Sequence, residues 1–490
     1  MMLDIYDHLI QMPFYTYFRQ ISAIPRSSGN EEAVSVYVVG FAREHGLEWQ
    51  QDKHFNVIIR KKGSPGHEHD NPVVMQCHMD MVCEKTAESS HDFTKDPIVF
   101  TAVDGFLKAD ETSLGADNGV GMAYILSVLA DENLIHPPIE AIFTTSEEVG
   151  LEGMAALDGT WITGERMINL DGEEEGILYT SCAGGARYYL EKAVSFQPME
   201  EGMTGWKIEV KNLRGGHSGV DIDKGRGNSI IILARLITKL KERVAFGVST
   251  IGGGSKTNAI PRNAYAVIWT ECDQEQGIKS FIADYGAKLK REYGGNEPDL
   301  IVECELVTAE EGETSRIISP DSLNCVLDCL LLLPNGLLGY SPYLPGVVEC
   351  SSNLGIMNVV EDKAVIAGLV RSNNNFRLDD AMLRVRRLAD CLKFGFEERN
   401  RYPAWEFRKD SVLRDLSAQV YHELFDREIE TQSIHGGLEC ALMFEKKQKI
   451  DMISLGPNLY DVHTVNERAE IASIIRVLDY LVKLLERLCS

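Results

Sequence analysis

The chain has 490 residues, a formal net charge of −25, 44% hydrophobic residues and 25% charged residues. It is longer than one ordinary domain of about 150 residues, so at least two domains are expected. This composition is typical of a globular protein rather than a disordered one, and the negative charge disfavours nucleic acid and anionic membranes as partners.

The cysteines and the first residues favour a reducing cytoplasm. The 11 cysteines are odd in number and scattered, without a C-x-x-C pair, which is typical of free thiols. Residues 1–15 carry acidic side chains where a secretory signal has Lys or Arg, and no apolar run approaches the roughly 18 residues that span a bilayer. We therefore expect a cytoplasmic protein that binds neither membrane nor nucleic acid.

Residues 1–186 alternate helical patterns with short apolar runs, which is typical of an α/β domain with a largely parallel sheet. Ser28 and Asn30 predict the start of a helix whose apolar face includes Val36 and Val39. Buried strands are predicted at 71–77, 139–145 and 166–170, with an apolar helix at 118–130.

Residues 187–402 have a different pattern, in which strands and amphipathic helices predict an α+β domain. Strands are predicted at 206–210 and 264–270, a hairpin at 355–360 and 364–371, and helices at 228–244, 278–293 and 379–399. The α/β pattern returns from residue 403, with a helix at 412–425, a strand at 452–455 and a closing helix at 467–488.

The return of the first pattern predicts a discontinuous α/β catalytic domain, 1–186 and 403–490, with a mostly parallel sheet flanked by helices. Residues 187–402 are then a large inserted α+β domain. Thr464 and Glu467 predict a capping box for the closing helix.

Acidic and histidine side chains follow the predicted strands, where open α/β sheets place their ligands and catalytic groups. Each has a plain structural alternative when taken alone: a structural histidine, a helix cap, surface glutamates or a turn residue. Their shared placement favours a cation site with carboxylate and imidazole ligands. These residues are His78 with Asp80, Asp117, Glu147 with Glu148, and Asp171.

Two of these pairs predict a division of roles. Asp80 lies two residues after His78, on the same side of an extended chain, so it can accept a hydrogen bond from the second ring nitrogen of a metal-binding histidine. Adjacent side chains of an extended segment point in different directions. Glu148 can therefore bind a cation while Glu147 accepts a proton from metal-bound water.

A second imidazole ligand is expected from the returning α/β segment. His463, in Asp461-Val462-His463, is the favoured candidate because it lies in a loop before the last predicted helix. His435, which two glycines follow, is the alternative.

Six motifs occur in order across nearly the whole chain: QCHMDMV, SLGADNGVG, FTTSEEVG, INLDGEE, GGHSGVDI and DVHTVNE. In this order they resemble the co-catalytic zinc peptidases that include aminoacylases and bacterial dipeptidases, most closely those acting on Xaa-His. The resemblance implies hydrolysis of unblocked dipeptides, including β-Ala-His, with two Zn²⁺ ions that Co²⁺ or Mn²⁺ can replace. An aminoacylase or tripeptidase of the same family has the same ligands and is the alternative.

The resemblance also implies how the ligands divide between the cations. Asp117 bridges both cations in this comparison. His78 and Asp171 complete one site, and Glu148 and His463 complete the other.

The same comparison implies that Asp80 orients His78 and that Glu147 is the general base. The base relays a proton from a water held between two cations about 3.5 to 4 Å apart. His217, in the glycine-rich segment RGGHSG of the inserted domain, is implied to stabilise the tetrahedral oxyanion. The plain alternative for His217 is a histidine in a glycine-rich turn. The alternative for the whole protein is a metal-binding module without catalysis, which would not need a free Glu147 beside a ligand.

Substrate contacts are implied for Asn258 and Arg371, and His435 is a further candidate. Arg371 can bind a C-terminal carboxylate through two parallel hydrogen bonds, although a surface salt bridge is an equally ordinary role. The inserted domain is implied to act as a lid and to mediate a homodimer.

Overall fold

The computed structural model describes residues 2–307 and 316–489. The chain divides into two compact units. Unit 1 comprises Met1–Cys182, Trp405–Ser433 and Leu438–Ser490, and unit 2 comprises Ala183–Ala404 and Ile434–Gly437. The sequence pattern assigned residues 434–437 to the catalytic domain, whereas the structure places them in unit 2.

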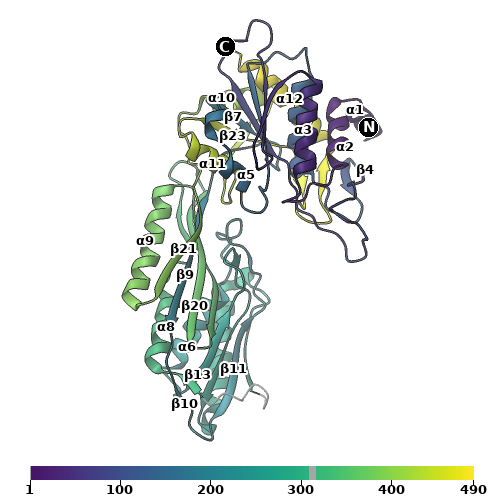
Figure 1. Ribbon diagram of the computed structural model, residues 1–490. Helices are drawn as coiled ribbons and strands as arrows, with labels where there is room; N and C mark the ends of the chain where they lie inside the picture. Colours follow the sequence, from purple (N-terminus) through teal and green to yellow (C-terminus); the bar gives the residue numbers. More distant parts are fainter. Residues whose placement is uncertain (1, 308–315, 490) are drawn as a thin grey trace. The chain divides into compact units, whose positions relative to one another are not determined.

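Unit 1 contains an eight-stranded sheet whose four central strands are parallel. Figure 1 labels two of these central strands, β7 (Arg166–Asn169) and β23 (Asp451–Ser454). The order is β1 (Glu48–Gln51), β2 (Val57–Lys61), β6 (Ile139–Thr144), β3 (Val73–His78), β7 (Arg166–Asn169), β23 (Asp451–Ser454), β8 (Ile177–Cys182) and β22 (Glu430–Ile434). The strands predicted at 71–77, 139–145, 166–170 and 452–455 are β3, β6, β7 and β23, so the predicted α/β class is confirmed.

Helices bury the central strands. Every residue of β3 and β6 is buried, as expected for parallel strands covered on both faces. α4 (Ala116–Ala130) packs on β3, and α3 (Glu32–Glu44) packs on β1 and β2. The predicted apolar face of α3 is partly wrong, because Val36 is 59% exposed. The other unit 1 helices are α1 (Met2–Leu9), α2 (Pro13–Ser22), α5 (Glu152–Ala156), α10 (Val412–Phe425), α11 (Glu439–Lys446) and α12 (Ile471–Arg487).

A four-stranded sheet completes unit 1: β24 (Leu459–Tyr460), β25 (Arg468–Glu470), β5 (Phe106–Ala109) and β4 (Phe100–Val103). The predicted closing helix therefore starts too early, because residues 468–470 pair with β5 before α12 begins at Ile471.

Unit 2 contains an eleven-stranded sheet with helices α6 (Ser229–Leu240), α7 (Glu275–Tyr293), α8 (Pro320–Leu332) and α9 (Asn375–Leu392). Its main path is β16 (Ile301–Leu306), β11 (Thr204–Lys211), β15 (Ala264–Thr270), β13 (Gly247–Gly253), β19 (Val348–Val360), β20 (Lys363–Ser372), β9 (Gly184–Ala193) and β21 (Gly395–Tyr402). β10 (Phe196–Pro198), β17 (Arg316–Ile318) and β18 (Gly336–Tyr340) join it at the side, and β12 (Gly216–His217) pairs with β14 (Ala259–Ile260).

The predicted hairpin of unit 2 is β19–β20. The helix predicted at 379–399 is too long, because Lys393 adopts a left-handed φ of 59° at its end and residues 395–402 form β21. Within residues 2–307 and 316–489, no helix has the length and hydrophobicity needed to cross a membrane.

Candidate metal centre

The parallel strands of unit 1 bring the predicted ligands to one edge of the sheet. His78 is the last residue of β3, Glu147 and Glu148 follow β6, and Asp171 follows β7. Neighbouring parallel strands end at the same side, so the side chains that follow them meet there.

Two triads of donor atoms share Asp117. His78 Nε2 lies 3.0 Å from Asp117 Oδ1 and 3.2 Å from Asp171 Oδ1. His463 Nε2 lies 3.1 Å from Asp117 Oδ2 and 3.0 Å from Glu148 Oε1. The ligand atoms of each triad lie within 4.8 Å of one another, close enough to surround one cation, and the two oxygens of Asp117 face different histidines.

The chemistry of these donors fits cations. Each Nε2 faces two carboxylate oxygens, but an imidazole nitrogen carries at most one hydrogen and so satisfies only one of them well. Hydrogen bonds that His463 donates to Asp117 and Glu148 raise its pKa to about 11, so the site stabilises positive charge. A divalent cation can bind all three donors of a triad together, and imidazole with carboxylate suits several transition metals.

Asp117 does not cap α4. Its φ and ψ are −80° and 112°, outside the helical region, and its two carboxylate oxygens face His78 and His463. Glu467 is instead the acceptor for the segment that leads into α4, because its carboxylate accepts hydrogen bonds from the N–H groups of residues 114–117. The capping box predicted for Thr464 and Glu467 is therefore wrong, because the Glu467 side chain binds a different helix.

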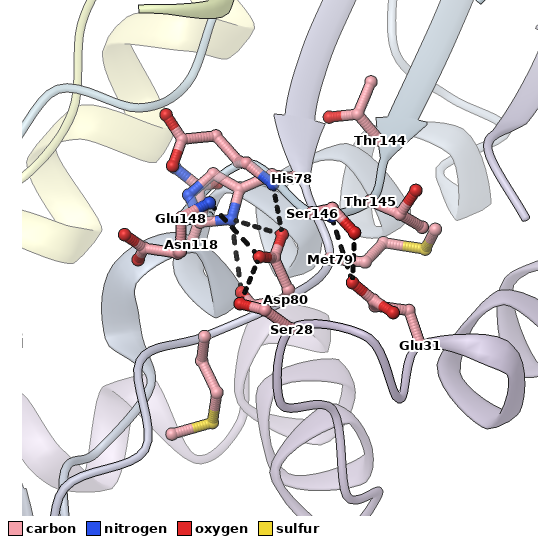
Figure 2. Close-up of polar contacts among 12 residues, drawn as sticks. Ser28, Glu31, His78, Met79, Asp80, Asn118, Thr144, Thr145, Ser146 and Glu148 are labelled. Atoms are coloured by element: carbon pink, nitrogen blue, oxygen red, sulfur yellow. Dashed lines mark hydrogen bonds and ion pairs between the residues drawn. The ribbon is translucent and has the colours of Figure 1, made fainter. Parts of the chain in front are cut away.

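Asp80 contacts both His78 and the glutamate loop. His78 Nδ1 lies 3.1 Å from the Asp80 main-chain oxygen and 3.4 Å from its Oδ1. The Asp80 carboxylate also accepts hydrogen bonds from the N–H groups of Glu147 and Glu148, at 3.0 and 3.2 Å. It accepts another from Ser28 Oγ (Figure 2). Burial raises the pKa of Asp80, but these hydrogen bonds and His78 outweigh it and lower the pKa to about 2.

Glu147 lies beside this centre without belonging to either shared triad. One of its carboxylate oxygens lies within 4.8 Å of donor atoms of His78 and Glu148. Burial raises the pKa of Glu147 well above its usual value; His78 opposes this shift, and Asp171 and Glu148 add to it. A carboxyl group with a raised pKa beside a cation site has the chemistry of a general base.

In unit 2, His217 lies at the end of β12 and contacts Arg371 of β20. His217 Nε2 lies 3.3 Å from Arg371 Nη2, and its Nδ1 accepts hydrogen bonds from the N–H groups of Gly219 and Val220. Burial and the charge of Arg371 lower the pKa of His217, so the imidazole is neutral at neutral pH. The Asn258 main-chain oxygen accepts a 2.9 Å hydrogen bond from Ser218 N, next to His217.

Arg371 is 6% exposed and Nη1 donates to the Tyr402 hydroxyl at 2.7 Å. Its Nε has no hydrogen-bond partner, and the side chain is buried rather than at the surface. The alternative of a surface salt bridge is therefore wrong. A buried guanidinium with an unused donor is suited to an anionic ligand.

His435 is held among the same residues of unit 2. Its Nε2 lies 2.8 Å from Ser351 Oγ and its Nδ1 lies 3.0 Å from Asn373 Oδ1. Burial, Arg371 and His217 lower its pKa to about 3. Of the two candidates for the second imidazole of the triads, His463 is the one beside Asp117 and Glu148.

Comparison with known proteins places the chain in a family. The sequence profile of peptidase family M20/M25/M40 matches residues 74–487. The chain belongs to this peptidase family. The resemblance to peptidases carried by the six motifs is thereby confirmed.

Similar proteins cover this M20/M25/M40 chain almost completely. The chain is 35% identical over 483 residues to the cytosol non-specific dipeptidase of Escherichia coli (strain K12), covering 98% of this chain and 99% of that protein. The crystal structure of aminoacylhistidine dipeptidase from Vibrio alginolyticus has a TM-score of 0.90 and 32% identity, covering 97% and 96%. An aminopeptidase structure from Bacillus cereus has a TM-score of 0.55 and 15% identity, covering 97% and 98%, which shows a shared fold.

Sequence reasoning missed several buried polar residues beneath the ligands. Glu439 is fully buried at the start of α11, and its Oε2 accepts hydrogen bonds from Gln76 and Thr144. Burial raises the pKa of Glu439 to about 8. Gln76 in turn accepts a hydrogen bond from Asn169. The sequence signal for these buried polar residues is a polar side chain inside a strand that is otherwise apolar, such as Gln76 in VVMQC.

Proposed function

We propose that the protein is a cytoplasmic metallodipeptidase that hydrolyses unblocked dipeptides, Xaa-His and β-Ala-His among them, with two zinc ions per chain. The observation that carries this proposal is the orientation of Asp117, whose two oxygens face two separate histidine and carboxylate sets. The substrate class is supported by the dipeptidase from Escherichia coli and by the aminoacylhistidine dipeptidase structure, both of which match nearly the whole chain.

In this proposal Asp117 is the shared ligand. His78 and Asp171 complete one cation site, and Glu148 and His463 complete the other. Two divalent cations bound there supply an activated water and a polarised scissile carbonyl. Asp80 orients His78 and also holds the loop of Glu147 and Glu148 through its N–H groups.

Glu147 is the general base in the proposed reaction. It accepts a proton from the attacking water and delivers it to the leaving amine, which must be protonated before it departs. Burial raises the pKa of its carboxyl well above the usual value, which makes the carboxylate a stronger base. Because Glu148 points to His463, the two adjacent glutamates can carry different roles.

The proposed substrate contacts come from unit 2. Arg371 has a buried, unused donor for the C-terminal carboxylate of a dipeptide. His217 can donate a hydrogen bond to the developing oxyanion, and Asn258 holds the loop beside it. Since both nitrogens of His435 have partners, we propose that His435 acts on the substrate through Ser351. A homodimer formed through unit 2, acting as a lid, is part of the same proposal.

The test is to remove metal with a chelator, restore zinc, and compare rates on dipeptides, tripeptides and acyl-amino acids. The panel includes β-Ala-His. We expect hydrolysis only after metal is restored, with dipeptides as the preferred substrates. A preference for acylated amino acids or tripeptides would favour the alternative hydrolases of the family, and the absence of hydrolysis with zinc, cobalt or manganese would contradict the proposal.

A further inference from the structure

The carboxylate of Glu467 binds the segment that carries Asp117. Its Oε2 accepts hydrogen bonds from the N–H groups of Leu114 and Gly115, at 2.8 and 2.9 Å, and its Oε1 from those of Ala116 and Asp117, at 2.8 and 3.3 Å. The residue is only 3% exposed. One side chain therefore binds four consecutive N–H groups of the segment 114–117 that leads into α4, whereas a local helix cap commonly satisfies one or two.

Arg26 binds the same segment through a carbonyl. Its Nη2 donates to the Gly115 main-chain oxygen, and its Nη1 donates to the oxygens of Met79 and Asp80 at 2.9 and 3.0 Å. Arg26 is 2% exposed. Burial lowers its pKa, and the charges of Glu467 and Asp80 counter that shift. Residues 114–117 are thus held by a buried cation and a buried anion.

Three ligand-bearing segments meet at these two side chains. Met79 and Asp80 directly follow His78, residues 114–117 end in Asp117, and Glu467 follows His463 by four positions. Glu467 and Asp117 are 350 positions apart in the chain. A cap needed only to stabilise α4 could come from a nearby Ser, Asp or Asn. A cap from the loop of the second histidine also fixes the separation between that histidine and Asp117.

We propose that Glu467 and Arg26 are positioning residues that hold the Asp117 carboxylate between the two cation sites and thereby set the affinity for the cations. This inference rests on the proposed two-cation function. Glu467 and Arg26 act through the backbone of residues 79–80 and 114–117 and bind no cation themselves. Partners of metal ligands that orient them in this way typically change metal affinity about 10- to 100-fold when replaced.

The chain offers a matched control in Glu140. Glu140 is also a buried glutamate of unit 1, 4% exposed, whose carboxylate accepts hydrogen bonds from the N–H groups of Thr163 and Gly164. It is the second residue of β6, at the opposite end of that strand from Glu147. Glu140→Gln therefore disturbs a similar buried carboxylate away from the cation sites.

The experiment titrates metal-free protein with Co²⁺ and follows binding by calorimetry and by the visible absorption of the bound ion. We expect Glu467→Gln to weaken binding of at least one Co²⁺ by about tenfold or more and to change its absorption, with Glu140→Gln staying within about twofold of the wild type. Arg26→Lys keeps the positive charge but loses the guanidinium group that donates to three main-chain oxygens. This variant should also weaken Co²⁺ binding, and it provides the test if Glu467→Gln does not fold.

Wild-type affinity and absorption for both ions in a folded Glu467→Gln or Arg26→Lys variant would overturn the inference. Equal weakening in Glu140→Gln would also overturn it, because the effect would then follow from lost stability. A wild-type chain that binds fewer than two Co²⁺ would instead contradict the proposed function, so the two failures are distinguishable.

Discussion

His463 Nε2 lies 3.1 Å from Asp117 Oδ2, although 346 positions separate the two residues in the chain. The other oxygen of Asp117 faces His78 Nε2 at 3.0 Å. Burying several carboxylates together is costly unless positive charge offsets it. The convergence of two histidines and three carboxylates therefore favours a pair of cations over a structural role for any one of these residues.

Replacement of the general base should separate catalysis from metal binding. Glu147→Gln removes the proton acceptor but not a proposed ligand, so kcat should fall about 10²- to 10⁴-fold while the bound metal stays unchanged. Glu152→Gln is the control, because Glu152 is an exposed glutamate a few residues later in the chain. Steady-state kinetics and metal analysis give both readouts, and normal turnover in Glu147→Gln would show that another group is the base.

Loss of the second histidine should remove one cation. His463→Ala leaves Asp117 and Glu148 without their imidazole partner, so metal analysis after removal of excess zinc should find one ion per chain in place of two. His422→Ala is the control, since His422 is exposed and pairs with Glu428. Retention of both ions by His463→Ala would mean that this side chain is not a ligand.

Arg371 should matter most for the binding of substrates that carry a free carboxylate. Hydrogen bonds to a charged group contribute about 1.5 to 3 kcal/mol, so Arg371→Met should raise KM for a dipeptide roughly 10- to 100-fold. A dipeptide amide should show little change, and Arg399→Met, which removes an exposed arginine paired with Glu397, should leave both substrates unaffected. An equal loss on the amide would contradict carboxylate binding.

His435 should make the stability of the protein sensitive to acid. Its pKa in the folded protein is lowered to about 3, against an ordinary value of about 6.5 when unfolded. The unfolded chain therefore binds the proton first, so the contribution of neutral His435 is fully present above pH 6.5 and is lost as pH falls towards 3.

Between pH 6.5 and pH 5 this group should cost the wild type about 2 kcal/mol of unfolding free energy. His435→Gln keeps a side chain that can hydrogen-bond to Ser351 but does not titrate. The unfolding free energy of this variant should therefore fall by about 2 kcal/mol less than that of the wild type between pH 6.5 and pH 5. Urea unfolding at several pH values measures the difference. Parallel curves for the two proteins would show that His435 is not held neutral.

Much of the fold and of the candidate site follows from local sequence patterns. The apolar runs before His78, Glu147 and Asp171 are β3, β6 and β7, and strands of a parallel sheet necessarily deliver the residues after them to one edge. The boundaries that were wrong depend on long-range pairing. Residues 468–470, for example, continue a helical pattern but pair with β5.

The parts that the sequence did not predict depend on residues far apart in the chain. Nothing local indicates that Glu467 caps α4 rather than α12, because Thr464 lies at the spacing of a capping box. Likewise, His435 lies in an α/β segment by pattern but is held by Ser351 and Asn373 of unit 2. Such partners are decided by tertiary packing, which local periodicity does not contain.

In the proposed function one carboxylate, that of Asp117, is shared by two cations. Anomalous X-ray diffraction from crystals of the zinc-loaded protein locates the ions directly. We predict two zinc peaks about 3.5 to 4 Å apart on either side of Asp117, one beside His78 and Asp171 and the other beside Glu148 and His463. A single peak, or zinc bound only away from Asp117, would contradict the shared role of Asp117.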